Sequence, residues 1–139
     1  MVRLGVFGYH NEEKNEFDAR NYLHYAGVDA TLGQEKWEIN LQYLYREDSN
    51  AFFVKPDSVD TTTDGGLAEI VILPRGDQSR WVFTGLYNQI DSNGTQYDTK
   101  RATASVSHLP ARNLRFVIEY TYDIERDRSE GVLGVVAAF

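Results

Sequence analysis

Polar side chains recur at alternate positions in several stretches of the sequence, which is the spacing that brings side chains to one face of a β-strand. Carboxylates, amides, hydroxyls and a guanidinium in such an arrangement could line a water-filled passage and select among solutes or ions. They could also pair across neighbouring strands and fill a narrow interior, which is the role that we favour. Arg115 and Glu119 lie four residues apart on one strand and would need partners on other strands. The set comprises Glu38, Asn40, Gln42, Glu69, Thr103, Ser105, Arg115, Glu119, Thr121 and Asp123.

Other reactive side chains are not spaced for catalysis or metal binding. His10, His24 and His108 lack metal-ligand spacing with one another or with a carboxylate, so we interpret them as ordinary surface or interface histidines. Ser107 and His108 are adjacent on an expected strand and point to opposite faces, which prevents them from pairing as nucleophile and base. The sequence has no cysteine and no glycine-rich phosphate loop or nucleophile elbow. We therefore predict no enzyme activity, no cofactor and no metal.

Two features lie in the expected connection at 49–65. The segment 57–66 contains three aspartates that could contact a divalent cation, but it does not match a helix–loop–helix calcium site, and we interpret it as a solvated loop. The apolar run 51–54, which includes Phe52 and Phe53, is costly in an exposed loop unless it is covered. It could extend the preceding strand, fold inward as a constriction or contact a partner, and the sequence does not distinguish these roles.

The strands that position the polar set follow from the alternation of apolar and polar residues. Apolar residues occupy every odd position of 37–46 and every even position of 114–124, with single additions at Leu44 and Val117. Both patterns indicate β-strands with one apolar and one polar face. Weaker alternation and intervening turn residues extend the prediction to an all-β fold, an antiparallel up-and-down barrel in one domain that spans 1–139. The eight expected strands are 2–10, 19–32, 37–47, 66–74, 80–91, 97–109, 113–125 and 131–139.

Aromatic residues indicate which face of the barrel meets which environment. A soluble barrel is apolar inside, whereas a membrane barrel turns its apolar side chains to lipid and its polar side chains inward. If odd-numbered strands run upward, Trp37 and Trp81 lie at the lower ends of their strands. Tyrosines near the upper ends then form a second belt about 20 Å higher, close to the ~25 Å apolar band of membrane barrels. These tyrosines are Tyr9, Tyr43, Tyr45, Tyr87, Tyr120 and Tyr122.

Composition and charge exclude several classes. The chain of 139 residues carries a net charge of −7, which argues against a nucleic-acid partner. Its longest uncharged apolar run, 131–139, is about half of the ~20 residues that a membrane-spanning helix needs. The amino terminus lacks the regions of a secretory signal, so either the protein stays in the cytoplasm or its export signal has been removed.

The last strands carry a family resemblance. The segment 134–139, which ends on a carboxyl-terminal Phe139, resembles the final strand of bacterial outer-membrane β-barrel proteins, and 112–123 is similar to the penultimate strand of porins. The resemblance implies a location in the bacterial outer membrane, contact with lipid or detergent, and recognition of the strand ending in Phe139 by the assembly machinery. It also implies a porin-like function, either passive permeation of small solutes or ions, or a structural membrane barrel.

The sequence is compatible with several alternatives. Porins of this kind have sixteen or more strands, so the chain is either a small barrel in its own right or the carboxyl-terminal half of a larger porin. A soluble β-barrel that binds a small apolar ligand in its interior, or a fragment or engineered barrel without a pore, would have the same strand pattern. The solute, the oligomeric state and whether the lumen is open or filled do not follow from the sequence.

Overall fold

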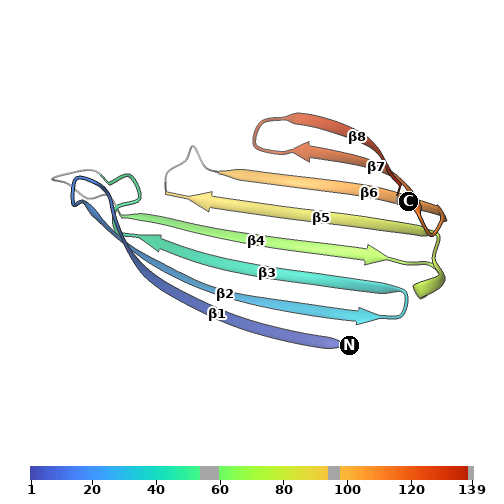
Figure 1. Ribbon diagram of the computed structural model, residues 1–139, viewed down its shortest axis with the longest axis horizontal. Coiled ribbons are helices and arrows are strands. Elements are labelled where there is room, and N and C mark those ends of the chain that lie inside the picture. The colour runs from blue at the N-terminus through green and yellow to red at the C-terminus, as the bar shows by residue number, and fades with distance from the viewer. Residues whose placement is uncertain (54–59, 94–97, 138–139) are drawn as a thin grey trace.

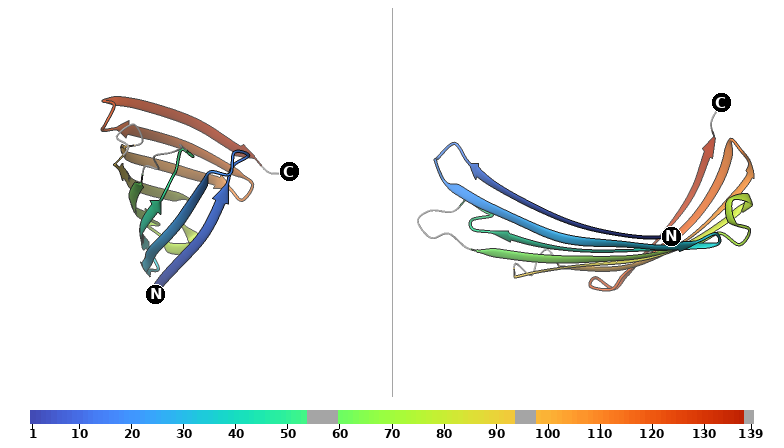
Figure 2. Two further views of the ribbon diagram at one scale, coloured as in Figure 1. Left: turned by 90° about the vertical axis from the view of Figure 1, so that its left-hand side faces the viewer. Right: turned by 90° about the horizontal axis from the view of Figure 1, so that it is seen from below.

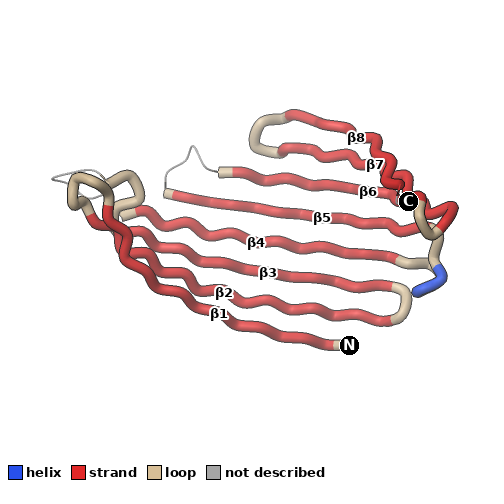
Figure 3. The backbone as a smooth tube through the Cα atoms, viewed as in Figure 1, coloured by secondary structure: helices blue, strands red, loops and turns tan. Residues whose placement is uncertain are grey.

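The computed structural model describes residues 1–53, 60–93 and 98–137. Eight strands form one antiparallel sheet in which the spatial order of the strands is their order in the chain (Figure 1). The connection between β4 and β5 contains the short 3₁₀ helix η1 (Gly76–Gln78), and β-strands make up most of the backbone (Figure 3). The strands are β1 (Val2–Lys14), β2 (Arg20–Gln34), β3 (Trp37–Asp48), β4 (Thr61–Ile72), β5 (Trp81–Ser92), β6 (Thr99–Ala111), β7 (Leu114–Asp123) and β8 (Arg128–Ala137).

The eight expected strands and their up-and-down order are confirmed; the largest differences are at two ends, and β8 begins at Arg128, three residues before its expected start. The polar segment 11–14, expected to be a loop, continues β1, because Lys14 pairs with Arg20 across the first hairpin. An ion pair of 3.1 Å between Glu12 and Arg20 joins the two strands there. Strand β4 begins at Thr61, five residues before the expected position, and pairs from there with Asp48 at the end of β3.

The sheet is not closed, which corrects the expectation of a barrel. Every pairing in the described part of the chain joins strands that are neighbours in sequence, and β1 is not paired with β8. Figure 2 shows a strongly curved single layer whose two edge strands stand apart. The strands are also staggered along the sheet: the row of paired residues that starts at Leu4 in β1 ends at Ser129, the second residue of β8. The two edge strands therefore overlap little along the strand direction.

The sheet has two chemically distinct faces, because side chains alternate between the faces along each strand and the pairing register aligns this alternation across all eight strands. We call the first the apolar face; it carries aliphatic and aromatic side chains from β1 to β8. We call the second the polar face; it carries most of the carboxylates, amides and hydroxyls of the strands. The apolar face includes Leu4, Val6, Val28, Leu41, Tyr43, Ile70, Tyr87, Phe116, Ile118, Tyr120 and Leu133.

Burial follows the faces in the opposite sense to that of a soluble protein. Ile118 on the apolar face is 60% exposed, whereas Asp123 on the polar face of the same strand is 8% exposed. Among the described residues, only Ala19 and Leu23 are apolar and buried, and the largest fully buried side chains are those of Asn21 and Asp48. The polar face therefore lies on the shielded, inner side of the curve, and the apolar face is the exposed outer side.

Candidate functional site on the polar face

The ten polar residues singled out from the sequence all lie on the polar face. Asn40 pairs directly with Glu69, Thr103 pairs with Thr121, and other members follow at alternate positions. Ser105 pairs with Glu119, and the row through Gln42 passes through β4, β5 and β6 to Asp123. The strand alternation was thus sufficient to bring these side chains to one surface.

Asn40 organises a cluster on the polar face of β2, β3 and β4. Its side-chain amide donates hydrogen bonds of 3.0 Å to Glu38 Oε1 and to Glu69 Oε2. Its carbonyl oxygen accepts a 2.9 Å hydrogen bond from the hydroxyl of Thr31. Three strands therefore contribute to a single network, in which one amide holds two carboxylates. A hydrogen bond to an ionised acceptor is stronger than one between neutral groups, so this network fixes both carboxylates in place.

A second cluster closes the polar face at the end of β3, around Asp48. This residue is 1% exposed, and its Oδ1 accepts hydrogen bonds of 2.9 Å from Arg46 Nη2 and from Asn21 Nδ2. Arg46 Nε also donates to Asp48 Oδ2. The side-chain oxygen of the buried Asn21 also accepts a hydrogen bond of 2.9 Å from the backbone N–H of Asn50. A buried carboxylate is stable only when it is paired and hydrogen-bonded, and both conditions are met here.

A third cluster lies around Asp123 at the corresponding end of β7. Its Oδ2 contacts Arg101 Nε at 3.1 Å and Arg126 Nη1 at 3.8 Å, and its Oδ1 accepts from the backbone N–H of Arg126 at 3.1 Å. The partner of Arg115 is Ser107, whose hydroxyl oxygen lies 2.8 Å from Nη2. Cross-strand partners therefore exist for Asn40 and Glu69, for Thr103 and Thr121, for Asp123 and for Arg115, whose partner is a hydroxyl rather than a carboxylate.

The polar face also carries apolar side chains that the periodicity did not separate. Phe7, Gly27 and Leu44 are paired in one row across β1, β2 and β3. The ring of Phe7 covers Gly27, where an added methyl group would overlap it. Further apolar side chains alternate with the polar ones on the same surface. They include Leu23, Leu67, Val71, Leu86, Ile90 and Val117.

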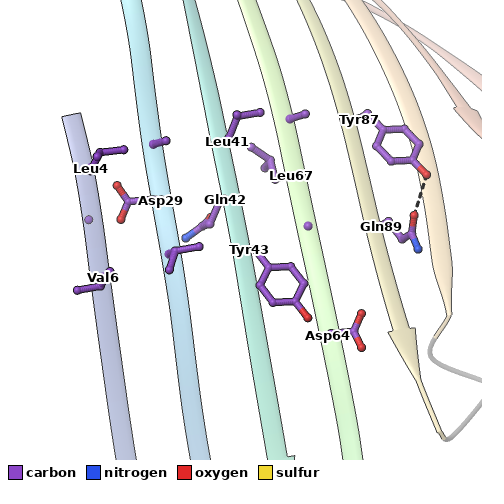
Figure 4. Close-up of a pocket in the computed structure, with 15 residues that line it drawn as sticks. Leu4, Val6, Asp29, Leu41, Gln42, Tyr43, Asp64, Leu67, Tyr87 and Gln89 are labelled. Atoms are coloured by element: carbon purple, nitrogen blue, oxygen red, sulfur yellow. Dashed lines mark hydrogen bonds between the residues drawn. The ribbon is translucent and has the colours of Figure 1, made fainter. Parts of the chain in front are cut away.

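The apolar face holds a shallow groove of about 740 Å³ that crosses β1 to β5 (Figure 4). Small residues at Ala30, Gly66 and Ala68 form its floor, and larger side chains such as Leu41 stand around it. At one end, the hydroxyl of Tyr87 lies 2.9 Å from Gln89 Oε1. The groove is almost entirely apolar and faces outward.

The expected aromatic belts are present in part. Trp37 and Trp81 are the first residues of β3 and β5, at the end of the sheet where the β2–β3 turn lies, and both belong to the apolar face. Tyr45 and Tyr122 lie on the same face towards the opposite end. Tyr9 is an exception: it pairs with Tyr25 and lies on the polar face, because β1 alternates with its even residues outward.

The histidines are arranged in a way that the sequence spacing did not show. His10 and His24 are directly paired across β1 and β2, with ring centroids 4.4 Å apart, and His108 lies against Trp81 at 4.1 Å. Only the hairpin register, in which positions 10 and 24 are equidistant from the turn, could have indicated the first pair. Within the described residues, no group of three or more metal-ligating side chains is close enough to hold a metal ion.

The remaining sequence expectations concern the connections and the carboxyl terminus. Phe52 and Phe53 do not extend β3, which ends at Asp48; they lie in the turn that follows, where Phe52 is half-exposed. Of the aspartate-rich segment, Asp64 belongs to β4, whereas Asp57 lies outside the described residues. Phe139, expected to take part in assembly, also lies outside them.

Comparisons with known protein families, with curated proteins and with solved structures found no match for this chain. Among the described residues, the only helix is too short to cross a membrane. The fold and the chemistry of its two faces are therefore the basis for a functional assignment.

Proposed function

We propose that this chain is a porin-like β-barrel of the bacterial outer membrane, in which the apolar face contacts lipid and the polar face forms the interior. The single observation that carries the proposal is the inversion of burial. Large apolar side chains such as Leu133, which is 81% exposed, stand on the outer side of the sheet, whereas the largest fully buried side chains are the polar ones of Asn21 and Asp48.

An exposed apolar surface of this extent is unfavourable in water. Soluble monomers rarely expose contiguous apolar patches larger than a few hundred Å², and this face runs across the whole sheet. Lipid hydrocarbon removes the cost, because it is as apolar as the side chains that it covers. The strands are long enough to span a membrane, since a tilted membrane strand needs about 9–11 residues; β7 and β8 have 10 each, and the other strands have 12 to 15.

Lipid imposes a further requirement on the backbone. Unpaired N–H and C=O groups are not tolerated in the hydrocarbon region, so a sheet that spans a membrane must close. Closure of eight strands leaves an interior just wide enough for side chains to fill. The hydrogen-bonded clusters around Asn40, Asp48 and Asp123 suit such an interior. We therefore favour a structural barrel with a largely filled interior over a wide passage for solutes.

The proposal is tested by refolding the protein into detergent micelles and into lipid vesicles. Trp37 and Trp81 lie on the apolar face, so their fluorescence is expected to be quenched by lipids with brominated acyl chains. The refolded protein should also migrate differently on a gel before and after boiling. A protein that stays monomeric and dispersed without detergent, with no quenching by brominated lipids, would refute the membrane assignment.

Conductance across a planar bilayer then separates the two forms of the proposed function. A filled interior predicts no stable conductance steps, whereas passive permeation predicts steps that scale with salt concentration. Recognition by the outer-membrane assembly machinery through the strand ending in Phe139 is part of the same proposal. It predicts that deleting Phe139 lowers insertion in cells more than it lowers refolding in detergent.

The groove on the apolar face favours a second candidate, a soluble protein that binds a small apolar ligand. Its volume of about 740 Å³ falls within the range of small-molecule sites. The groove is on the outer side, however, so this candidate requires a covering partner or a sheet that curves the other way. Saturable binding of a fatty acid by protein that is monomeric without detergent would favour it.

A further inference from the structure

The two free edges of the sheet present matching backbone groups. Met1 and Gly33 exchange two hydrogen bonds, of 2.6 and 2.9 Å, so odd-numbered residues of β1 bond to β2. Because bonding alternates along an antiparallel strand, the even-numbered residues of β1 direct their N–H and C=O groups to the free edge. These are the residues whose side chains belong to the apolar face.

The same reasoning applies to β8. Ile124 N–H donates to Lys100 C=O at 2.8 Å, so even-numbered residues of β7 bond to β6 and odd-numbered ones bond to β8. Their partners in β8 are even-numbered, as in the pair of Glu119 with Val132. The odd-numbered residues of β8 therefore direct their backbone groups to the other free edge, and they too belong to the apolar face. The two edges can pair without exchanging the faces of the sheet.

The stagger of the strands selects the register of this pairing. The row of paired residues that starts at Leu4 ends at Ser129. From there β1 continues to Lys14 in one direction and β8 continues to Ala137 in the other. The two strands come side by side along their lengths only if β8 is shifted relative to the row, and such a shift is what the tilt of strands in a closed barrel produces.

Shifting β8 by eight residues relative to the row gives a strand tilt that barrels adopt and also fits the lengths of β1 and β8. In an eight-stranded barrel it corresponds to a tilt of about 36°, inside the range of about 35–45° that barrels adopt. It places Ser129 opposite Glu12 instead of Leu4, and every residue of β8 then lies opposite a residue of β1. A smaller even shift gives too shallow a tilt, and a larger one leaves Arg128 beyond the end of β1.

We propose, on the basis of the membrane barrel proposed above, that β1 pairs antiparallel with β8 of the same chain in this one register, with Val6 opposite Val135. The seam then consists of five hydrogen-bonded pairs on the apolar face. These are Leu4 with Ala137, Val6 with Val135, Gly8 with Leu133, His10 with Gly131, and Glu12 with Ser129.

The side chains at the seam fit this register. Gly8 lies opposite Leu133 on the apolar face, and Gly5 lies opposite Val136 on the polar face. On the polar face, Phe7 lies opposite Gly134, so the ring that covers Gly27 meets no bulky side chain on its other side. Gly8, Gly131 and Gly134 have only ordinary contacts and so leave room for the larger side chain opposite each of them, whereas the space above Gly5 is taken by the carboxylate of Asp29.

The polar face identifies the partner as the same chain rather than a second copy. A second copy could complete a wider barrel of sixteen strands with the same register. A wide lumen would expose Phe7, Leu44, Leu67 and Leu86 to water, because all four lie on the polar face. The narrow interior of an eight-stranded barrel is filled by side chains and would bury them.

Engineered disulfides test the seam directly, because the natural sequence has no cysteine. Hydrogen-bonded antiparallel pairs have Cα atoms about 5.5 Å apart, inside the window of about 4.4–6.8 Å for a disulfide. The double variant Val6→Cys/Val135→Cys, refolded in lipid vesicles and mildly oxidised, is expected to form a disulfide within one chain in most molecules. The variant Ala30→Cys/Leu41→Cys, at a pair already present between β2 and β3, gives the reference yield.

Two further variants test the register. Val6→Cys/Leu133→Cys and Val6→Cys/Ala137→Cys correspond to shifts two residues smaller and two residues larger, with Cα atoms about 7–8 Å apart in the proposed register. Both are expected to form little disulfide. Leu4→Cys/Ala137→Cys provides a second pair in the proposed register, in case the first variant fails to refold.

The possible outcomes separate the parts of the proposal. A higher disulfide yield for a shifted pair than for Val6→Cys/Val135→Cys overturns the register. A disulfide that joins two chains overturns closure within one chain. If the Ala30→Cys/Leu41→Cys variant forms its disulfide and no seam disulfide forms, the seam is overturned. Tryptophan quenching by brominated lipid is measured on the same samples. A seam disulfide without quenching supports the seam and refutes the membrane function, whereas quenching without a seam disulfide refutes the seam alone.

Discussion

Replacing Ile118 by arginine is the sharpest test of which face meets lipid. Ile118 lies in the middle of β7 on the apolar face, is 60% exposed, and is paired with Val106 and Leu133. If the face is in contact with hydrocarbon, the introduced guanidinium must be buried in lipid or must distort the bilayer to reach water. If the face is in contact with water, the same side chain replaces an apolar surface group with a charged one.

The two environments predict effects that differ in size. A charged residue on the lipid face of a barrel costs about 2–4 kcal/mol at the midplane and about 0–1 kcal/mol near the interface. For Ile118→Arg this cost lowers the folding equilibrium constant by about 30-fold to several hundred-fold, since about 1.4 kcal/mol is a factor of ten. In water, a substitution at an exposed position changes stability by only about 0.5 kcal/mol in either direction.

The measurement is a urea titration of the protein refolded in lipid vesicles, followed by tryptophan fluorescence. Ile124→Arg is the matched control: it makes the same change just beyond the end of β7, at a position that is 44% exposed. We expect a large loss of stability for Ile118→Arg and a loss of at most about 1 kcal/mol for Ile124→Arg. Equal, small effects of the two variants would show that Ile118 does not face lipid.

Three further predictions concern the polar face and the belts. Gly27→Ala is expected to destabilise the fold by about 1–3 kcal/mol in the same titration, because the methyl group would overlap the Phe7 ring and lie 2.9 Å from the backbone oxygen of Tyr43. Gly33→Ala has ordinary contacts and should cost less, and equal costs for the two variants would contradict the proposed overlap. Asp48→Asn should lower the free energy of unfolding by about 1.5–3 kcal/mol, because it removes the buried charge that Arg46 and Asn21 bind. Asp91→Asn, in the exposed pair with Lys100, should lower it by less than about 1 kcal/mol. Similar values for both variants would argue against a buried network. In a Trp37→Phe variant, the fluorescence of Trp81 should be quenched more by lipids brominated near the headgroup than by lipids brominated at the end of the acyl chain, because Trp81 is the first residue of β5. Stronger quenching by lipids brominated at the chain end would place Trp81 deep in the bilayer and contradict an aromatic belt at the membrane interface.

Strand alternation predicted most of the fold because it is a local property. The stretch 37–46 shows the pattern directly, and the eight strands follow in order from the turns between them. The same local rule explains the errors. The polar segment 11–14 carries no apolar alternation, and it is a strand only because its residues pair with β2 and Glu12 bonds Arg20.

For the candidate site too, the sequence predicted the local features and missed those that depend on the pairing between strands. The shared face of residues such as Asn40 and Glu69 was predictable because it depends only on the parity of positions along each strand. Their partners were not, since they depend on the register between strands. The contact of Arg115 with Ser107 and the pairing of His10 with His24 both arise from registers that the sequence pattern alone leaves open. Closure is a property of still longer range, because it concerns strands more than 100 residues apart.

The order of strands in the sheet has a consequence for how the molecule forms. Each described strand pairs only with those before and after it in the chain, so assembly can advance hairpin by hairpin without a distant segment having to be found first. Contacts between residues close in sequence generally speed folding, because little loop entropy is lost before they form. If the chain forms the proposed membrane barrel, it can add one hairpin after another, and the joining of its first and last strands is the one slow, long-range event.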